Sequence, residues 1–134
     1  MTRILVDTHI LLEITNRSVA KNRPGLATRL FSMTAQNAVS VVSFWEIAIK
    51  TRLGKLDPGM ELEDMSNAAI EAGMIILPIE LRHVLATLEA DPPTRDPFDR
   101  LLLAICQVEG YKLATVDRAL VGHPLALDTK GAIP

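Results

Sequence analysis

Four carboxylates in this sequence share a setting that could support chemistry. Asp7 follows the apolar run Ile4-Leu5-Val6, Asp117 follows a second apolar segment, and Glu46 and Asp99 lie in the first turns of predicted helices. Carboxylates that are packed together raise one another's pKa, so such a cluster is unfavourable unless a cation occupies it. Mg²⁺ and Mn²⁺ prefer oxygen ligands of this kind. The pattern indicates a divalent-metal site if the fold brings the four acids together.

Most of these acids also have an ordinary structural explanation as helix caps. A short acceptor side chain can bond the free amides of a first helical turn, and Asp7 and the neighbouring Asp96 each precede a predicted helix. Asp117 could likewise cap the helical turn that follows the fourth predicted strand. Glu46 lies three residues after Ser43, which matches the capping-box pattern. Considered singly, Asp7, Glu46 and Asp96 are better explained by capping than by catalysis.

Asp99 is the exception, because its predicted helix (residues 97–109) is apolar nearly all round. A carboxylate there is either paired with a cation such as Arg95 or Arg100, or is part of a polar site. Both interpretations remain open for Asp99 considered alone.

The elements that must position these acids alternate between strand and helix. We expect strands at residues 4–6, 38–42, 74–77 and 111–115, and a fifth at 125–127. Helices are expected at 8–14, 25–34, 43–53, 62–72, 80–88 and 97–109, with a helical turn at 116–120 and a looser segment at 16–24. This alternation predicts an α/β three-layer sandwich with a mainly parallel central sheet of about five strands covered by helices. In such a sheet, residues just past the strand ends converge on one crevice.

Composition narrows the class of protein. The 134 residues, 49% of them hydrophobic, suit a single domain spanning 1–134 with one sizeable core. A net charge of −2 excludes a protein that holds nucleic acid by overall charge alone. No segment has the length of a membrane span or a signal-peptide core. The single cysteine, Cys106, lies in an apolar run, where we expect it in the core; this usage suits a reducing cytoplasm.

Other site chemistries are poorly supported. The three histidines have no paired helical spacing and there is no second cysteine, which argues against structural zinc. The sequence also has no Gly-rich phosphate loop of the Walker type and no nucleophile elbow. Carboxylate–metal chemistry is what remains.

Four sequence blocks resemble a known family. They are Leu5-Val6-Asp7-Thr8-His9, Val41-Val42-Ser43-Phe44-Trp45-Glu46-Ile47-Ala48-Ile49-Lys50, Arg95-Asp96-Pro97-Phe98-Asp99-Arg100-Leu101-Leu102 and Leu113-Ala114-Thr115-Val116-Asp117. In these blocks the chain resembles PIN-domain ribonucleases and, among them, VapC-type toxins of prokaryotic toxin–antitoxin modules. One departure is that many relatives of this subgroup carry a histidine just before the third block, where this chain has Thr94, so the resemblance implies no histidine role in this loop.

The resemblance implies roles for individual residues. Asp7, Glu46, Asp99 and Asp117 would be the catalytic, metal-binding acids, and the cofactor would be Mg²⁺ or Mn²⁺. Supporting roles fall to Thr8, Thr115 and Asp96, of which Asp96 is the less certain ligand; candidate RNA contacts are Lys50, Arg95 and Arg100. For Lys50, one helical turn after Glu46, an intrahelical ion pair is the alternative.

The resemblance also implies an activity and partners. RNA phosphodiesters would be cleaved by a metal-activated water, a small antitoxin of the VapB type would inhibit the site, and the toxin would be a cytoplasmic homodimer. Two rival functions are a phosphoacceptor signalling domain and a non-catalytic binding module of the same fold. The first needs a neighbouring acid pair, but Asp7 is followed by Thr8 and His9. The second is disfavoured because all four acids are present.

Overall fold

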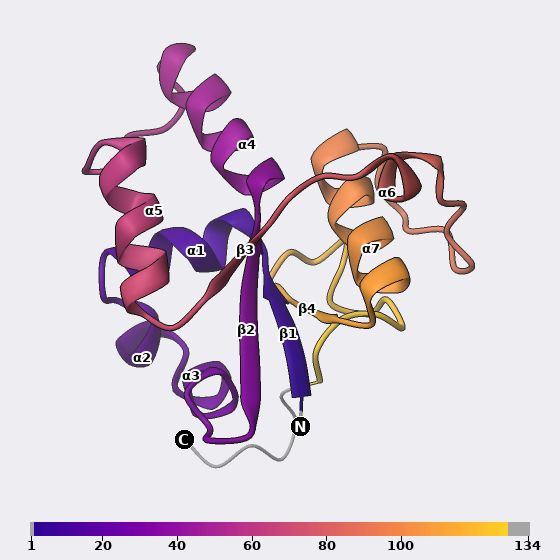
Figure 1. Cartoon of the computed structure of the whole chain (residues 1–134), viewed down its shortest axis with the longest axis horizontal. Coiled ribbons are helices and arrows are strands. Elements are labelled where there is room, and N and C mark those ends of the chain that lie inside the picture. Colours follow the sequence, from indigo (N-terminus) through magenta and orange to yellow (C-terminus); the bar gives the residue numbers. More distant parts are fainter. Residues whose placement is uncertain (1, 129–134) are drawn as a thin grey trace.

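The computed structural model describes residues 2–128, which form four parallel strands and seven helices (Figure 1). The strands are β1 (Thr2–Val6), β2 (Ala35–Ser40), β3 (Ile75–Leu77) and β4 (Lys112–Ala114), in the order β3-β2-β1-β4. All strand pairs are parallel. Because β2 and β4 lie on opposite sides of β1, the chain changes direction across the sheet at β1. In parallel sheets a ligand crevice lies beyond the carboxyl ends of the strands at such a point.

Helices cover both faces of the sheet, so the predicted three-layer α/β sandwich is confirmed. They are α1 (Thr8–Thr15), α2 (Val19–Asn22), α3 (Pro24–Leu30), α4 (Val41–Arg52), α5 (Leu62–Glu71), α6 (Leu81–Leu85) and α7 (Pro97–Glu109). Figure 1 shows α1, α2, α3 and α5 on one side of the sheet and α6 and α7 on the other, with α4 continuing from the end of β2. No helix within residues 2–128 is long and apolar enough to cross a bilayer.

The alternation of side chains along β1 explains why the sheet is buried on both faces. Ile4 and Val6 pack in a hydrophobic cluster with Ile10 of α1, and Leu5 packs in a second cluster with Leu103 of α7. All five side chains are fully buried. Successive residues of a strand point to opposite faces, so a continuous apolar run is what a doubly covered strand requires.

The sheet has four strands in the described residues, one fewer than expected. The segment 125–127 contributes only an isolated parallel bridge between Ala126 and Leu113. Two backbone hydrogen bonds attach it, from Leu113 N to Leu125 O and from Leu127 N to Leu113 O, both 2.8 Å. The segment lies beside β4 without extending into a strand.

The junction between β2 and α4 differs from the prediction, and the predicted capping box is wrong. The strand ends at Ser40, whose hydroxyl accepts a hydrogen bond from Val42 N at 3.0 Å and caps α4. Ser43 therefore lies inside the helix, fully buried, and its hydroxyl has no hydrogen-bond partner among the described residues. Val41 and Val42 favour strands by propensity, but the serine before them supplies the cap, and tertiary packing overrides propensity.

Several other helix boundaries also shift because of contacts with distant residues. The helix expected at 25–34 ends at Leu30, whose carbonyl accepts a hydrogen bond from Asn37 Nδ2 at 2.7 Å. The helix expected at 80–88 ends at Leu85, because Gln107 bonds the following loop at the carbonyl of residue 87 and the amide of residue 89. The segment expected to be looser, residues 16–24, contains the short helix α2, and residues 116–120 form a turn. Cys106 is buried as expected, and burial raises the pKa of its thiol.

Candidate active site

A pocket of about 350 Å³ lies beyond the carboxyl ends of β1 and β4, and all four predicted acids line it. The acids come from different parts of the fold: Asp7 follows β1, Glu46 lies on α4, Asp99 lies on α7 and Asp117 follows β4. We call this cavity the acid pocket; it is also lined by Thr8, His9, Leu12, Lys50, Leu56, Leu102 and Val116. The fold therefore brings together the carboxylates that the sequence separates by up to 110 residues.

Asp7 combines a capping role with a place in the acid pocket. Its Oδ1 accepts a hydrogen bond from Ile10 N at 2.9 Å and so caps α1, as the sequence predicted. Asp7 is only 7% exposed, and burial raises the pKa of its carboxyl, partly offset by hydrogen bonds from Thr115 and from Ile10 N. Capping and pocket lining are thus compatible in one carboxylate.

Glu46 is the most tightly held of the four acids. Thr8 donates its hydroxyl to Glu46 Oε1 at 2.6 Å, and Lys50 donates its ammonium to Oε2 at 2.5 Å. Both oxygens are therefore engaged, and the residue is only 7% exposed. Thr8 belongs to α1 and Lys50 lies one turn further along α4, so the carboxylate is fixed from two elements.

Asp99 has the clearest electrostatic signature in the pocket. Burial, followed by the charges of Asp96, Asp117, Glu46 and Asp7, raises its pKa to about 6. The charges of four neighbouring carboxylates thus add to the effect of burial on this carboxyl. A bound divalent cation would remove that penalty, so the all-oxygen acid set fits a hard ion such as Mg²⁺ or Mn²⁺.

Asp96, Asp117 and Thr115 are supported by local hydrogen bonds. Asp96 caps α7, because its Oδ1 accepts bonds from Phe98 N at 2.8 Å and from Asp99 N at 3.2 Å. Asp117 is exposed and caps the turn that follows β4, accepting from the amide of residue 119 at 2.9 Å. Thr115 Oγ1 accepts from Asp117 N at 3.1 Å. Thr115 therefore links the two acids that follow β1 and β4.

The three predicted RNA-contacting cations are not placed together. Lys50 lines the acid pocket, whereas Arg95 and Arg100 line a different cavity, of about 740 Å³, between α6 and α7. Arg100 donates to Asp91 Oδ1 at 2.8 Å and to the Thr94 carbonyl at 3.2 Å, which braces the loop before α7.

A polar network beside the acid pocket escaped the sequence analysis. Glu13 of α1 is 5% exposed and pairs with His9 at 2.9 Å and with Arg23 at 2.8 Å, while Asn22 Nδ2 donates to its other oxygen at 3.2 Å. His9 lines the acid pocket. The spacing of His9 and Glu13, four residues apart on a predicted helix, was the available signal.

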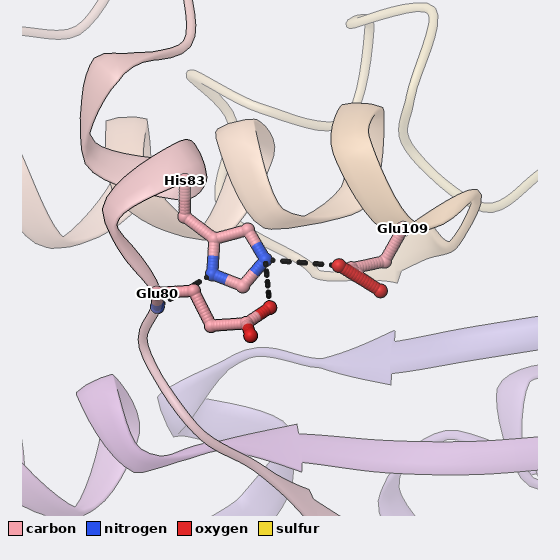
Figure 2. Close-up of side chains that lie close together, drawn as sticks. All are labelled: Glu80, His83 and Glu109. Carbon is pink, nitrogen blue, oxygen red and sulfur yellow. Dashed lines mark hydrogen bonds and ion pairs between the residues drawn. The ribbon is translucent and has the colours of Figure 1, made fainter.

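A second group of potential metal ligands lies elsewhere, among Glu80, His83 and Glu109. Figure 2 shows the His83 imidazole between the two carboxylates. Glu109 ends α7, about 15 Å along the helix axis from Asp99 in its first turn. This group is therefore separate from the acid pocket.

The hydrogen bonds of His83 argue against a metal there. Its Nδ1 accepts from the backbone N–H of Glu80 at 3.0 Å, so the ring proton belongs on Nε2, which faces Glu109 Oε1 at 3.1 Å. A metal would need the Nε2 lone pair. Arg82 also pairs with both carboxylates. The arrangement is a closed network that joins α6 to the end of α7.

Comparison with known proteins agrees with the architecture. The PIN domain family matches residues 4–122. A solved toxin–antitoxin complex from Klebsiella pneumoniae contains a chain with a similar fold: the TM-score is 0.58, and 21% of residues are identical over 94% of this chain and 97% of that chain. Among curated proteins, no significantly similar sequence was found.

Proposed function

The chain belongs to the PIN domain family, and we propose that it is a divalent-metal-dependent endoribonuclease that acts as the toxin of a VapBC-like toxin–antitoxin system. PIN domains are generally nucleases, and the acid pocket supplies the chemistry that such an enzyme needs. The proposed domain spans the chain, residues 1–134.

One observation carries this proposal: four carboxylates from four separate parts of the fold line one pocket, where burial and then the charges of neighbouring acids raise the pKa of Asp99 to about 6. Helix capping explains the location of Asp7 and Asp117, but it does not explain why Asp99 and Glu46 face the same cavity. A collected charge of this kind is unfavourable for an unliganded protein, and it suits one that binds a cation.

In the proposed site, Asp7, Asp99 and Asp117 would hold the metal ion, and Glu46 would either hold metal or orient the water. When bound, Mg²⁺ or Mn²⁺ lowers the pKa of water and offsets the negative charge that develops on the phosphate. Glu46 can orient a water because Thr8 and Lys50 fix both of its oxygens. The Lys50 side chain, which is 43% exposed, also offers a positive charge to a substrate phosphate.

The direct test is RNA cleavage by the purified protein. We expect cleavage with Mg²⁺ or Mn²⁺, none with EDTA, and a loss of at least about a hundredfold in Asp7→Asn and Asp99→Asn. Asp64→Asn, which changes an exposed aspartate on α5, is the matched control and should cleave normally. If Asp7→Asn and Asp99→Asn cleaved RNA as well as Asp64→Asn does, the assigned acids would be wrong.

We further propose that a small VapB-like antitoxin inhibits the enzyme in the cytoplasm. The fold shared with a chain of a toxin–antitoxin complex supports a partner of this kind. Phe31 and Met33 are exposed apolar side chains that such a partner could contact. Met60 is partly buried and Met65 lies in the core, so neither offers a comparable surface.

We also propose that the toxin is a homodimer. Exposed apolar side chains on α4 and α6 support this proposal, because exposed apolar surface marks protein–protein contact sites when it gathers into a patch. They are Val41, Trp45, Leu81, Val84 and Leu85.

A further inference from the structure

A second, smaller cavity adjoins the acid pocket. It has a volume of about 270 Å³, and its lining includes Asn22, Arg23, Gly25, Thr115 and Val116. Val116 also lines the acid pocket, so the two cavities share a wall. We call this second cavity the Arg23 pocket.

Two polar contacts connect the cavities as well. Thr115, which lines the Arg23 pocket, bonds the side chain of Asp7 in the acid pocket. His9, which lines the acid pocket, has its Nε2 3.3 Å from Arg23 Nη2. A substrate strand that leaves the acid pocket over Val116 would therefore meet Arg23 next.

Arg23 is held in place by a buried carboxylate. Its Nε donates to Glu13 Oε2 at 2.8 Å, while Asn22 donates to the other oxygen of Glu13. A guanidinium has five N–H donors, and only Nε and Nη2 have partners among the described residues. The Arg23 side chain is 30% exposed, so its remaining donors can reach a ligand. Arginine presents these donors in a rigid fork that matches phosphate oxygens.

We propose that the Arg23 pocket is the subsite for the RNA nucleotide next to the scissile phosphate, with Arg23 contacting the phosphate of that nucleotide. This inference rests on the proposed ribonuclease function. The acid pocket repels the RNA backbone, so an oriented cation one step along the strand provides attraction that the pocket itself cannot. Glu13 is a positioning residue in this arrangement, because it touches Arg23 and His9 rather than the RNA.

Binding can be measured without cleavage in an Asp99→Asn background, using short fluorescently labelled single-stranded RNA and fluorescence anisotropy. Arg23→Met should raise the Kd about tenfold, the effect of losing one charge-assisted hydrogen bond. It should also reduce the slope of log K against log salt concentration by about 0.7, the value for one phosphate contact on a single strand. Arg17→Met, the same change at an exposed arginine outside both pockets, should alter neither.

A second variant blocks the Arg23 pocket without removing a charge. Gly25 lines the pocket and a Cβ there meets no atom within 4 Å, so Gly25→Gln adds a side chain at the wall of the pocket without a clash. Glutamine also favours helices over glycine, so the melting temperature should be unchanged or higher. RNA binding should nevertheless weaken severalfold.

A small phosphodiester separates the subsite from the acid pocket. Bis(p-nitrophenyl) phosphate is small enough to be hydrolysed in the acid pocket alone, so Arg23→Met in the otherwise wild-type enzyme should hydrolyse it normally while its KM for RNA rises. Equal losses on both substrates would mean that Arg23 only supports the fold of the acid pocket, contrary to the proposal.

The outcomes also separate this inference from the ribonuclease function. If the parent proteins bind and cleave RNA but Arg23→Met matches Arg17→Met in Kd and salt slope, the subsite is wrong and the ribonuclease function stands. If the Asp99→Asn parent binds no RNA and the wild type cleaves none, both proposals fail.

Discussion

At the scale of single residues, the raised pKa of Asp99 links the proposed metal site to the stability of the protein. The folded-state pKa is about 6 and the ordinary value is 3.8. Between these values the unfolded chain loses its proton while the folded chain keeps it, so the unfolded state is favoured. This group therefore lowers the stability of the metal-free protein as pH rises from about 4 to about 6, and the loss persists above that range.

Asp99→Asn should consequently stabilise the metal-free protein while abolishing its response to metal. In EDTA near pH 7, we expect its melting temperature to exceed that of the wild type by a few degrees, and the difference should shrink towards about pH 4. Mg²⁺ should raise the melting temperature of the wild type but not of the variant. Differential scanning calorimetry at several pH values measures both effects. An Asp99→Asn protein that is less stable than wild type at neutral pH would contradict the repulsion that we infer.

Thr8 offers a test of how Glu46 is positioned. Thr8→Val keeps the shape of the side chain but leaves Glu46 Oε1 without its donor in a buried setting, so we expect kcat to fall about tenfold. Thr8→Ser keeps the hydroxyl and should retain activity. Thr28→Val removes an exposed hydroxyl on α3 and serves as the control. Equal activity in Thr8→Val and Thr8→Ser would show that this hydrogen bond does not matter to catalysis.

At the scale of elements, helix N-termini position two of the four acids, and a third lies one turn further along its helix. Asp7 precedes α1, Asp99 lies in the first turn of α7, and Glu46 lies in the first half of α4. Two of these helices begin directly after strands of the parallel sheet, so their N-termini gather at one edge. The positive end of a helix dipole favours ionised carboxylates within its first turn. Capping and metal binding therefore draw on the same feature of the fold.

Asp96 allows capping to be separated from metal binding. Asparagine caps helices about as well as aspartate, whereas alanine loses about 1 kcal/mol. We expect Asp96→Ala to lower the melting temperature and Asp96→Asn to preserve it, and Asp96→Asn should still cleave RNA with Mg²⁺. Thermal unfolding and cleavage assays on the two variants provide the measurement. If Asp96→Asn were as inactive as Asp99→Asn, Asp96 would be a ligand as well as a cap.

The β2–α4 junction shows where sequence reasoning about elements is limited. Apolar periodicity located both elements, and the boundary was missed because Ser40 and Ser43 are equally good caps by residue type. The choice depends on the register with β3, which pairs Ser40 with Leu77 and ends the sheet there. Glu46 keeps its place in the acid pocket because the helix was predicted correctly even though its first residue was not.

At the scale of the whole molecule, the convergence of the acids could be predicted because it follows from topology. Strands that alternate with helices imply a parallel sheet, and parallel strands end at one edge, so Asp7 and Asp117 had to lie close together. The His9–Glu13–Arg23 network could not be predicted in the same way. It depends on how the connection between α2 and α3 folds back on α1, a segment that the sequence analysis treated as irregular.

The exposed apolar face of α6 leads to a prediction about assembly. Three of the five residues of this helix are large, apolar and more than 60% exposed: Leu81, Val84 and Leu85. Val84 of α6 lines a cavity together with Pro97, the first residue of α7. Trp45 of α4 packs edge-to-face on Phe98, the second residue of α7. Val84 and Trp45 therefore lie near the start of α7, and we propose that they and the exposed leucines of α6 form the centre of an interface. A stable dimer buries about 800 Å² on each partner, so α4 would have to contribute along with α6.

We therefore expect Leu85→Glu to convert a dimer into a monomer without unfolding the protein, because the glutamate remains in water in the monomer but would be buried unpaired in the interface. Sedimentation equilibrium gives the mass of each species. Ile70→Glu, which introduces the same charge at an equally apolar and exposed site on α5, should remain dimeric. A wild-type monomer would refute the homodimer, whereas a monomeric Ile70→Glu beside a dimeric Leu85→Glu would move the interface to α5. Because α4 carries Glu46 and Lys50 as well as Trp45, a dimer through this face would bring the two acid pockets into one assembly. RNA cleavage by the Leu85→Glu monomer would then show whether each acid pocket works alone.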